Sequence, residues 1–490
     1  MTAHEHALPR PVQHGRLCAG RRSSDARQDR AGNPARKRGG TRWSYARLDA
    51  AVRGTGAGLA ALGLPPGARV LLRLGNSVDF PLAFLGAIAV GLVPVPTSTA
   101  LTGPEMTAMA QGLDPALVIW DGDAALPDHP APVLTLERLR AMRELPPCAY
   151  DMGSPDRPGY IVFTSGSGGR PRAVVHAHRA VWARRMMWDG WYGLRPDDRM
   201  MHAGAFNWTY TLGTGLLDPW AIGATALVCA PGAPMGLLMR RHDATIFAAV
   251  PGVYRQLLDG GRVRDLPRLR HGLSAGEKLP EATRAAWNAA TGTMIYEALG
   301  MSECSTYISG SPARPAPPGA LGYPQDGRRI AVQDGILAIH RSDPGLMLGY
   351  LGPDGLDLPL QGEWFLTGDR VAQAEDGAVT YLGRDDDMMN AGGFRVSPLE
   401  VEASLAGHPQ IDDIAVTDVE IRPDVRIIAA FYTAALPLDE DDLSAFAAER
   451  LARYKQPRLY RHMPSLPRGA NGKLSRRSLR DQFRADDDNS

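Results

Sequence analysis

The stretch Tyr160-Ile-Val-Phe-Thr-Ser-Gly-Ser-Gly-Gly-Arg-Pro-Arg172 joins an apolar run of β-type residues to a loop of small, hydroxyl and cationic residues. Its glycines let successive backbone N–H groups converge on one anion, while the hydroxyls add donors and the arginines add charge. The pattern predicts a phosphate cradle. Its spacing is not that of a P-loop NTPase, which needs Gly-Lys followed by Ser or Thr. Alone, a Ser/Gly stretch is also typical of a surface turn, so the choice between a phosphate cradle and a surface turn depends on the other motifs of the chain.

Length and composition limit the class of protein. A chain of 490 residues with 44% hydrophobic residues exceeds what one core usually supports, which predicts at least two domains. A net charge of +1 gives no reason to expect a nucleic-acid partner. The four cysteines show no metal or redox spacing, which is typical of a cytoplasmic protein without a zinc site or disulfides. The apolar segment Pro81 to Pro96 is too short and too interrupted to span a membrane.

Residues 1–40 differ from the rest of the chain. They hold nine Arg or Lys against three Asp or Glu and almost no aliphatic residue. This composition predicts a disordered basic leader, with a nucleic-acid-binding arm as the less favoured alternative. No apolar segment follows Arg21-Arg22, so a secretory signal is not indicated.

From Trp43 onward, helical and strand patterns alternate. Ser44 can cap a helical pattern that continues to Leu62, and the strand 68–74, a helix near 80–90 and the strand 92–96 follow. This alternation predicts an α/β fold, in which a large N-terminal domain has mostly parallel sheets flanked by helices. We expect residues 116–120 and the strand that enters the cradle to continue the same sheet. Ligands of such sheets bind beyond the carboxyl ends of the strands.

Five further motifs follow the cradle in order: Gly272-Leu-Ser-Ala-Gly-Glu-Lys-Leu-Pro280, Thr293-Met-Ile-Tyr-Glu-Ala-Leu-Gly-Met-Ser-Glu303, Gly362-Glu-Trp-Phe-Leu-Thr-Gly-Asp369, Tyr381-Leu-Gly-Arg-Asp-Asp-Asp-Met-Met-Asn390 and Pro467-Arg-Gly-Ala-Asn-Gly-Lys473. Singly, each has an ordinary explanation. An exposed Glu at a strand end is usually solvated surface, an Asp after Gly is often a turn residue, and a loop Lys is usually free in solvent.

Together these motifs resemble the superfamily of acyl- and aryl-CoA synthetases, firefly-type luciferases and peptide-synthetase adenylation domains, over roughly Trp43 to Arg477. The family loop usually reads Thr-Ser-Gly-Thr-Thr-Gly-x-Pro-Lys. Here Gly168 stands where the second Thr is usual, and Arg172 stands where Lys is usual. Ser302 likewise replaces a usual Thr. Arg keeps the charge but replaces a compact ammonium with a planar fork.

The resemblance implies an ATP site and assigns its residues. Asp369 and Arg384 would bind the ribose, and Glu303 would bind Mg²⁺, a hard cation suited to carboxylate and phosphate oxygens. The catalytic residues implied are Lys473, Glu303, Ser302 and Thr164. The full set implied to contact ATP or AMP is Thr164, Ser165, Gly166, Ser167, Gly168, Gly169, Arg172, Ser274, Ala275, Gly276, Glu277, Glu297, Ala298, Leu299, Ser302, Asp369, Arg384 and Lys473.

The resemblance also divides the chain into residues 1–40, an N-terminal adenylation domain 41–385 and a small mobile α+β C-terminal domain 386–490 that carries Lys473. Asp386 would be the hinge. CoA would bind through Gly392, Gly393 and Arg395. The acyl pocket would be lined by Phe206, Asn207, Trp208, Tyr210 and Gly300, in a region similar to the acetyl- and benzoyl-CoA synthetase branches. Periodicity alone predicts for residues 202–225 only a buried helix that ends in a Gly turn.

The implied reaction has two steps. A carboxylic acid attacks the α-phosphate of ATP to give acyl-AMP and pyrophosphate, and the thiol of CoA then displaces AMP. No general base is needed, because the acid is already ionised at neutral pH. Two alternatives stay open: transfer to the pantetheine of a carrier protein, and a weakly active or non-catalytic nucleotide-binding remnant. The small Gly300 favours a short-to-medium aliphatic or benzoate-like monocarboxylate over acetate. Nothing in the sequence decides whether the chain forms a homo-oligomer.

Overall fold

The computed structural model describes residues 40–164, 171–230, 232–261, 263, 265–391, 394–422, 425–469 and 474–487. The described chain forms two compact units. Unit 1 contains the described residues up to Ala316 together with Gly322–Arg329 and Arg341–Leu360. Unit 2 contains Pro317–Leu321, Ile330–His340 and the described residues from Gln361 onward. The domain boundary between residues 385 and 386 stays a proposal.

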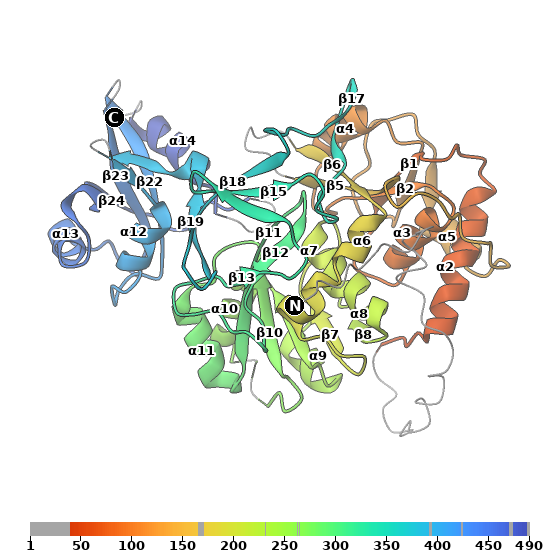
Figure 1. The fold of residues 1–490 in the computed structure, drawn as a ribbon, viewed down its shortest axis with the longest axis horizontal. Coiled ribbons are helices and arrows are strands. Elements are labelled where there is room, and N and C mark those ends of the chain that lie inside the picture. Colours follow the sequence, from red (N-terminus) through yellow and green to blue (C-terminus); the bar gives the residue numbers. More distant parts are fainter. Residues whose placement is uncertain are drawn as a thin grey trace. The chain divides into compact units, whose positions relative to one another are not determined.

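The first sheet of unit 1 is parallel, as its sequence predicts. Its order is β2-β1-β3-β4, and every pair of neighbours is parallel. The helices α2, α3 and α5 pack together beside this sheet (Figure 1). Ser44 caps α2 by accepting a hydrogen bond from the backbone N–H of Arg47. The bounds are α2 Tyr45–Ala60, β1 Arg69–Arg73, α3 Asp79–Ala89, β2 Val93–Pro96, α4 Gly103–Leu113, β3 Leu117–Trp120, β4 Val133–Thr135 and α5 Leu136–Met142.

The second sheet of unit 1 has seven strands in the order β13-β12-β11-β10-β9-β7-β8. The strands β8, β7, β9, β10 and β11 run parallel, whereas β12 is antiparallel to both of its neighbours, β11 and β13. Trp287 of α11 and Tyr254 of α10 pack against Phe247 in the core of this layer. The strand bounds are β7 Arg199–His202, β8 Thr225–Leu227, β9 Ile246–Ala249, β10 His271–Ala275, β11 Met294–Met301, β12 Ser305–Ser309 and β13 Tyr323–Pro324.

Several helices connect the strands of this second sheet. Residues 209–222 form consecutive helical segments that end at Gly223, whose φ is +90°, so the predicted helix with a Gly turn is confirmed for this part, whereas His202 ends a strand and residues 203–208 are not helical. The helical bounds are α6 Arg179–Ala183, η2 Trp188–Tyr192, α7 Thr209–Leu212, η3 Gly213–Leu217, α8 Asp218–Ile222, α9 Met235–Arg241, α10 Pro251–Asp259 and α11 Glu281–Thr291.

The strand that enters the cradle does not continue the parallel sheet, so that prediction was wrong. β5 Pro158–Thr164 pairs antiparallel with β6 Arg172–Ala177, in a separate sheet of order β17-β16-β6-β5. The other two strands are β16 Gly349–Gly352 and β17 Gly355–Asp357. An apolar run identifies a strand but not its partner, and here the partner is β6, which follows the cradle directly and runs antiparallel to β5.

Unit 2 contains an antiparallel sheet β14-β15-β18-β19, a three-stranded sheet β22-β23-β24 and the ribbon β20-β21. Its mixture of helices and strands agrees with the small α+β domain that the sequence predicts. The predicted fold class, an α/β protein with a second α+β unit, is therefore confirmed. Among the described residues, no helix is both long enough and apolar enough to cross a bilayer. The bounds are β14 Ile330–Gln333, β15 Ile336–His340, β18 Trp364–Gln373, β19 Val379–Arg384, η4 Asp385–Asp387, β20 Met389–Ala391, β21 Phe394–Val396, α12 Pro398–Leu405, β22 Asp413–Arg422, β23 Val425–Thr433, α13 Glu440–Ala448, η5 Arg453–Lys455, β24 Leu459–His462 and α14 Arg476–Asp487.

Candidate active site

The two ends of the cradle face each other across a strand pair. Thr164, the last residue of β5, is the register partner of Arg172, the first residue of β6. The guanidinium of Arg172 lies 3.2 Å from the centroid of the Tyr350 ring, in a cation–π contact. Residues 165–170, which include five of the predicted phosphate contacts, lie outside the described residues.

Glu303 lies two residues beyond the end of β11, in a turn that is hydrogen-bonded to neighbouring segments. Its side chain is buried, and its Oε1 accepts a hydrogen bond of 2.8 Å from the hydroxyl of Tyr350. Its carbonyl oxygen accepts from the backbone N–H of Met347 at 2.8 Å. The carbonyl of the preceding Ser302 lies 2.7 Å from Nε2 of His176 on β6, and burial lowers the pKa of His176 to about 4. These bonds connect the Ser302-Glu303 turn to the strand that leaves the cradle.

Two of the segments predicted to contact ATP or AMP, residues 274–277 and 297–299, lie side by side. β10 and β11 pair in parallel, so that Ser274 faces Glu297 and Ala275 faces Ala298, directly before Leu299. The buried Glu297 carboxylate accepts from the backbone N–H of Leu279 at 2.8 Å and pairs with Arg284 at 3.0 Å, and burial raises its pKa.

Gly276, which precedes Glu277 in this segment, has a φ of +100°, a backbone conformation that residues with a side chain rarely adopt. An added Cβ there would lie 3.1 Å from the ring of Trp208. The backbone at Gly276 therefore lies flat against Trp208, one of the residues predicted for the acyl pocket.

Trp208 and Tyr210, two of the residues predicted for the acyl pocket, belong to an aromatic cluster in unit 1. Tyr210 is buried, its ring meets that of Trp208 edge-on at 5.4 Å, and its hydroxyl lies 3.1–3.2 Å from the carbonyl oxygens of Ala249 and Leu273. Phe206 is also buried, and Asn207, which follows it, is half-buried.

Gly300 is surrounded by backbone. An added Cβ would lie 2.4 Å from the carbonyl oxygen of Ser305, on the neighbouring strand β12. A larger residue at Gly300 would therefore disturb the pairing of β11 with β12, so substitution here would not report cleanly on pocket size.

The structure also places His202, which the sequence analysis did not single out, beside the aromatic cluster that contains Tyr210. It ends β7, its ring meets Tyr210 edge-on at 4.7 Å, and neither of its buried ring nitrogens has a hydrogen-bond partner among the described residues. Burial lowers the pKa of His202 to about 3, so the ring is neutral at physiological pH. A polar residue at a strand end within an aromatic run was the signal that could have identified it.

The residues predicted to bind ribose are neighbours in unit 2. Asp369 and Arg384 are register partners on β18 and β19, with 3.4 Å between Nη1 and Oδ1. The Arg384 guanidinium also donates to the carbonyl of Thr367 at 2.6 Å. Gly368 has a φ of +74°, and an added Cβ would lie 2.7 Å from Arg384. This glycine therefore allows the guanidinium to lie against the strand.

The predicted hinge lies in the short helix η4 of unit 2. Asp385 pairs with Arg370 on β18 at 2.7 Å, and Asp387 pairs with Arg480 of α14 at 3.3 Å. The backbone at Asp386 is described, but its side chain is not, and the same holds for Arg395. Three further predicted residues lie outside the described residues: Gly392, Gly393 and Lys473.

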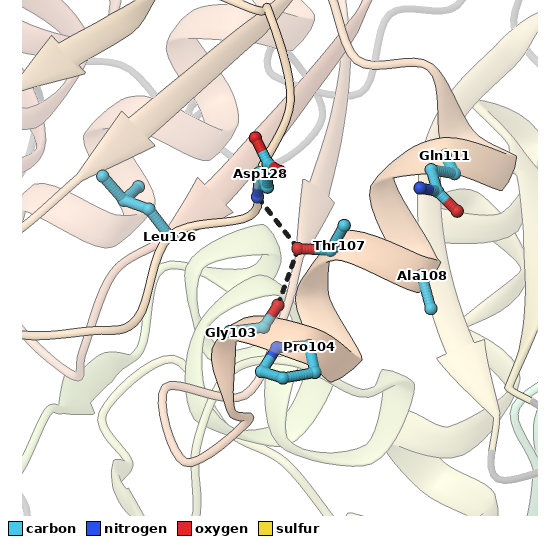
Figure 2. A pocket seen from close by; sticks show the side chains of 7 residues that line it. All are labelled: Gly103, Pro104, Thr107, Ala108, Gln111, Leu126 and Asp128. Atoms are coloured by element: carbon cyan, nitrogen blue, oxygen red, sulfur yellow. Dashed lines mark hydrogen bonds between the residues drawn. The ribbon is translucent and has the colours of Figure 1, made fainter.

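The described residues contain no group of three or more His, Cys, Asp or Glu side chains able to hold a metal ion. A surface pocket lies beside α4 (Figure 2), but Asp128 is its only titratable lining residue, and the Thr107 hydroxyl accepts from the Asp128 backbone N–H at 2.9 Å. None of the predicted site residues lines this pocket.

Comparison with known proteins gives consistent matches. The family described as AMP-binding enzyme matches residues 23–351, and the AMP-binding enzyme C-terminal domain matches residues 400–473. A benzoate–CoA ligase of Thauera aromatica is 32% identical, covering 89% of this chain and 90% of that protein. A 4-hydroxybenzoate–CoA/benzoate–CoA ligase of Rhodopseudomonas palustris is 31% identical, covering 89% and 88%. The solved structure of an anthranilate CoA ligase in complex with anthranoyl-AMP superposes with a TM-score of 0.85 at 25% identity, covering 98% of this chain and 99% of that one.

Proposed function

Because this chain belongs to the family of AMP-binding enzymes, we propose that it activates an aromatic carboxylic acid as its acyl-AMP, releases pyrophosphate and then transfers the acyl group to CoA. The observation that carries the proposal is the similarity, over nearly the whole chain, to ligases named for benzoate and 4-hydroxybenzoate. The geometry of unit 1 supports it. There, β6, which leaves the cradle, is bonded through His176 to the turn that holds Glu303.

The proposed chemistry needs fixed charge more than acid–base groups. A carboxylate is a poor electrophile, and adenylation gives it a good leaving group. Charge then builds on the phosphoryl oxygens and on the departing pyrophosphate, where preorganised donors and cations stabilise it most. We assign this role to Lys473, to Arg172 and to the hydroxyls of Thr164 and Ser302.

Glu303 fits the proposed Mg²⁺ site. Mg²⁺ is held in proteins by one or two carboxylates together with substrate phosphates, so it does not need a cluster of protein ligands. When bound, it neutralises charge on the phosphate oxygens. In the structure, Oε1 of the Glu303 carboxylate accepts a hydrogen bond from the hydroxyl of Tyr350 at 2.8 Å.

We expect an aromatic acid to be used far better than acetate. Each methylene buried in an apolar pocket contributes about 0.8 kcal/mol, roughly fourfold in affinity, so benzoate should exceed acetate in kcat/KM by more than about tenfold. The rate of pyrophosphate release with acetate, butyrate, hexanoate and benzoate measures this. A series led by acetate would show that the aromatic cluster around Tyr210 does not bind the acid.

We expect Arg172→Lys to raise the KM for ATP by about two- to fivefold and to change the KM for the acid less. An exposed cation–π contact contributes about 0.5–1 kcal/mol, and a lysine ammonium cannot reproduce the planar stacking of Arg172 on Tyr350. Steady-state kinetics with each substrate varied in turn measures both constants. A change confined to the acid would contradict the assignment of this residue to the phosphate loop.

CoA as the acceptor rests on the names of the relatives. Competition between CoA and a pantetheinylated carrier protein, at equal concentrations, distinguishes the two thiols. We expect CoA to be acylated in preference. Acylation of the carrier alone would identify an enzyme that loads carrier proteins.

A further inference from the structure

Tyr350 is placed to control the orientation of the Glu303 carboxylate. It lies on β16, the residue is 7% exposed, and its hydroxyl donates to Oε1 of Glu303 at 2.8 Å. Glu303 is itself 6% exposed. A carboxylate removed from water needs hydrogen-bond donors, and a bond to a charged acceptor is stronger than one between neutral groups. The Tyr350 hydroxyl therefore restricts the rotation of this carboxylate.

The backbone around the pair fixes where the hydroxyl lies. Tyr350 faces Val174 across the β16–β6 pairing, and the backbone N–H of Leu348 donates to the carbonyl of Val175 at 2.8 Å. The backbone N–H of Met347 in turn donates to the carbonyl of Glu303 at 2.8 Å. The segment before Tyr350 is therefore bonded both to β6 and to the Glu303 turn, which holds the Tyr350 ring beside the carboxylate.

Arg172 connects the phosphate loop to this pair. It is the first residue of β6, and its guanidinium covers the face of the Tyr350 ring at 3.2 Å from the centroid. A planar guanidinium stacks on an aromatic face better than a compact ammonium does. The replacement of the usual Lys by Arg at this position thus gives the Tyr350 ring a rigid neighbour.

From this geometry, and on the basis of the proposed function, we propose that Tyr350 is a positioning residue for the nucleotide-bound cation. It engages Oε1 of Glu303, so that Oε2 is the oxygen offered to Mg²⁺, while Arg172 holds the ring of Tyr350. A purely structural role for the hydroxyl would affect stability and leave metal binding unchanged. A positioning role changes metal affinity, because partners of a metal ligand typically alter it by about 10–100-fold.

The test is the substitution Tyr350→Phe, which keeps the ring and its contact with Arg172 and removes only the hydroxyl. In the presence of ATP and without acid, we expect the variant to bind Mn²⁺ about tenfold or more weakly than the wild type, as measured by electron paramagnetic resonance. The Mg²⁺ concentration for half-maximal pyrophosphate release should rise by a similar factor. Binding of metal-free ATP in EDTA should not change.

Tyr150→Phe is the matched control. Its hydroxyl also donates to a carboxylate, Oδ1 of Asp49, at 2.6 Å, but neither residue belongs to the predicted site. We expect this variant to bind Mn²⁺ as the wild type does. A second comparison is between the single variant Glu303→Gln and the double variant Glu303→Gln with Tyr350→Phe. The two should bind Mn²⁺ equally weakly, because both residues act through the same carboxylate.

The outcomes separate this proposal from the proposed function. If Tyr350→Phe binds Mn²⁺ with ATP as tightly as the wild type does, the hydroxyl does not position Glu303 and the proposal is overturned. Additive effects in the Glu303→Gln background would overturn it as well. Absence of pyrophosphate release from the wild type would instead contradict the proposed function, while the Mn²⁺ comparison would still decide the role of Tyr350.

Discussion

Lys473→Ala is expected to slow pyrophosphate release by about 100-fold or more. Removing one preorganised group that stabilises transition-state charge typically costs 10²- to 10³-fold in kcat, and the assignment gives Lys473 this role at the α-phosphate. The measurement is the rate of pyrophosphate release at saturating ATP and benzoate. Transfer from preformed benzoyl-AMP to CoA should keep most of its rate, because we assign Lys473 to the first step only.

Lys455→Ala is the control for this variant. Lys455 lies in η5 of the same unit and pairs with Glu400, so its removal tests the loss of a lysine outside the proposed chemistry. It should keep its pyrophosphate release close to that of the wild type. Equal rates for Lys473→Ala and the wild type would show that this site does not carry out adenylation through Lys473.

Arg184→Leu is expected to lower the free energy of unfolding of unit 1 by about 3–5 kcal/mol. Arg184 and Asp218 are 4% and 2% exposed and form a buried ion pair with 2.6 Å between Nη2 and Oδ2. Without the guanidinium, the Asp218 carboxylate would keep the Tyr192 hydroxyl, at 2.8 Å, and stay buried without its cation. Urea denaturation followed by tryptophan fluorescence measures the change.

Two comparisons establish the cause of that loss. Replacing both partners, in Arg184→Leu with Asp218→Leu, should recover much of the stability, because an apolar pair leaves no isolated charge. Arg450→Ala breaks the exposed pair with Glu449 and should cost less than about 1 kcal/mol. A loss below about 1 kcal/mol for Arg184→Leu would mean that water or another group compensates Asp218.

The sequence predicts the elements of this fold better than their partners. The strands near 68–74, 92–96 and 116–120 are β1, β2 and β3 of one parallel sheet, as expected, because their apolar runs and intervening helical patterns are local signals. Pairing of β6 with β16 depends on residues almost 180 positions apart, for which no local pattern exists. β5 was assigned to the parallel sheet wrongly for another reason: it pairs with β6, which follows the cradle directly and runs antiparallel to it, and an apolar run identifies a strand but not the direction of its partner.

The site residues likewise fall into those predicted from local motifs and those found only from contacts in the structure. Glu303, Asp369 and Arg384 lie in short motifs, so sequence alone predicts them as site residues, and the structure shows Asp369 beside Arg384. Tyr350 and His202 have no such motif. Tyr350 becomes significant only through its contact with Glu303, 47 positions away, and His202 only through the burial of both ring nitrogens. The roles assigned to Lys473 and Gly392-Gly393 stay proposals, because these residues lie outside the described ranges.

Identification of the nucleotide product tests the proposed reaction most directly. The full chain is incubated with Mg²⁺, CoA, benzoate and ATP labelled at the α-phosphate, and the products are separated by chromatography. The account predicts one AMP and one pyrophosphate for each benzoyl-CoA formed, with acyl-AMP accumulating when CoA is left out. Formation of ADP and phosphate in step with the thioester would contradict it.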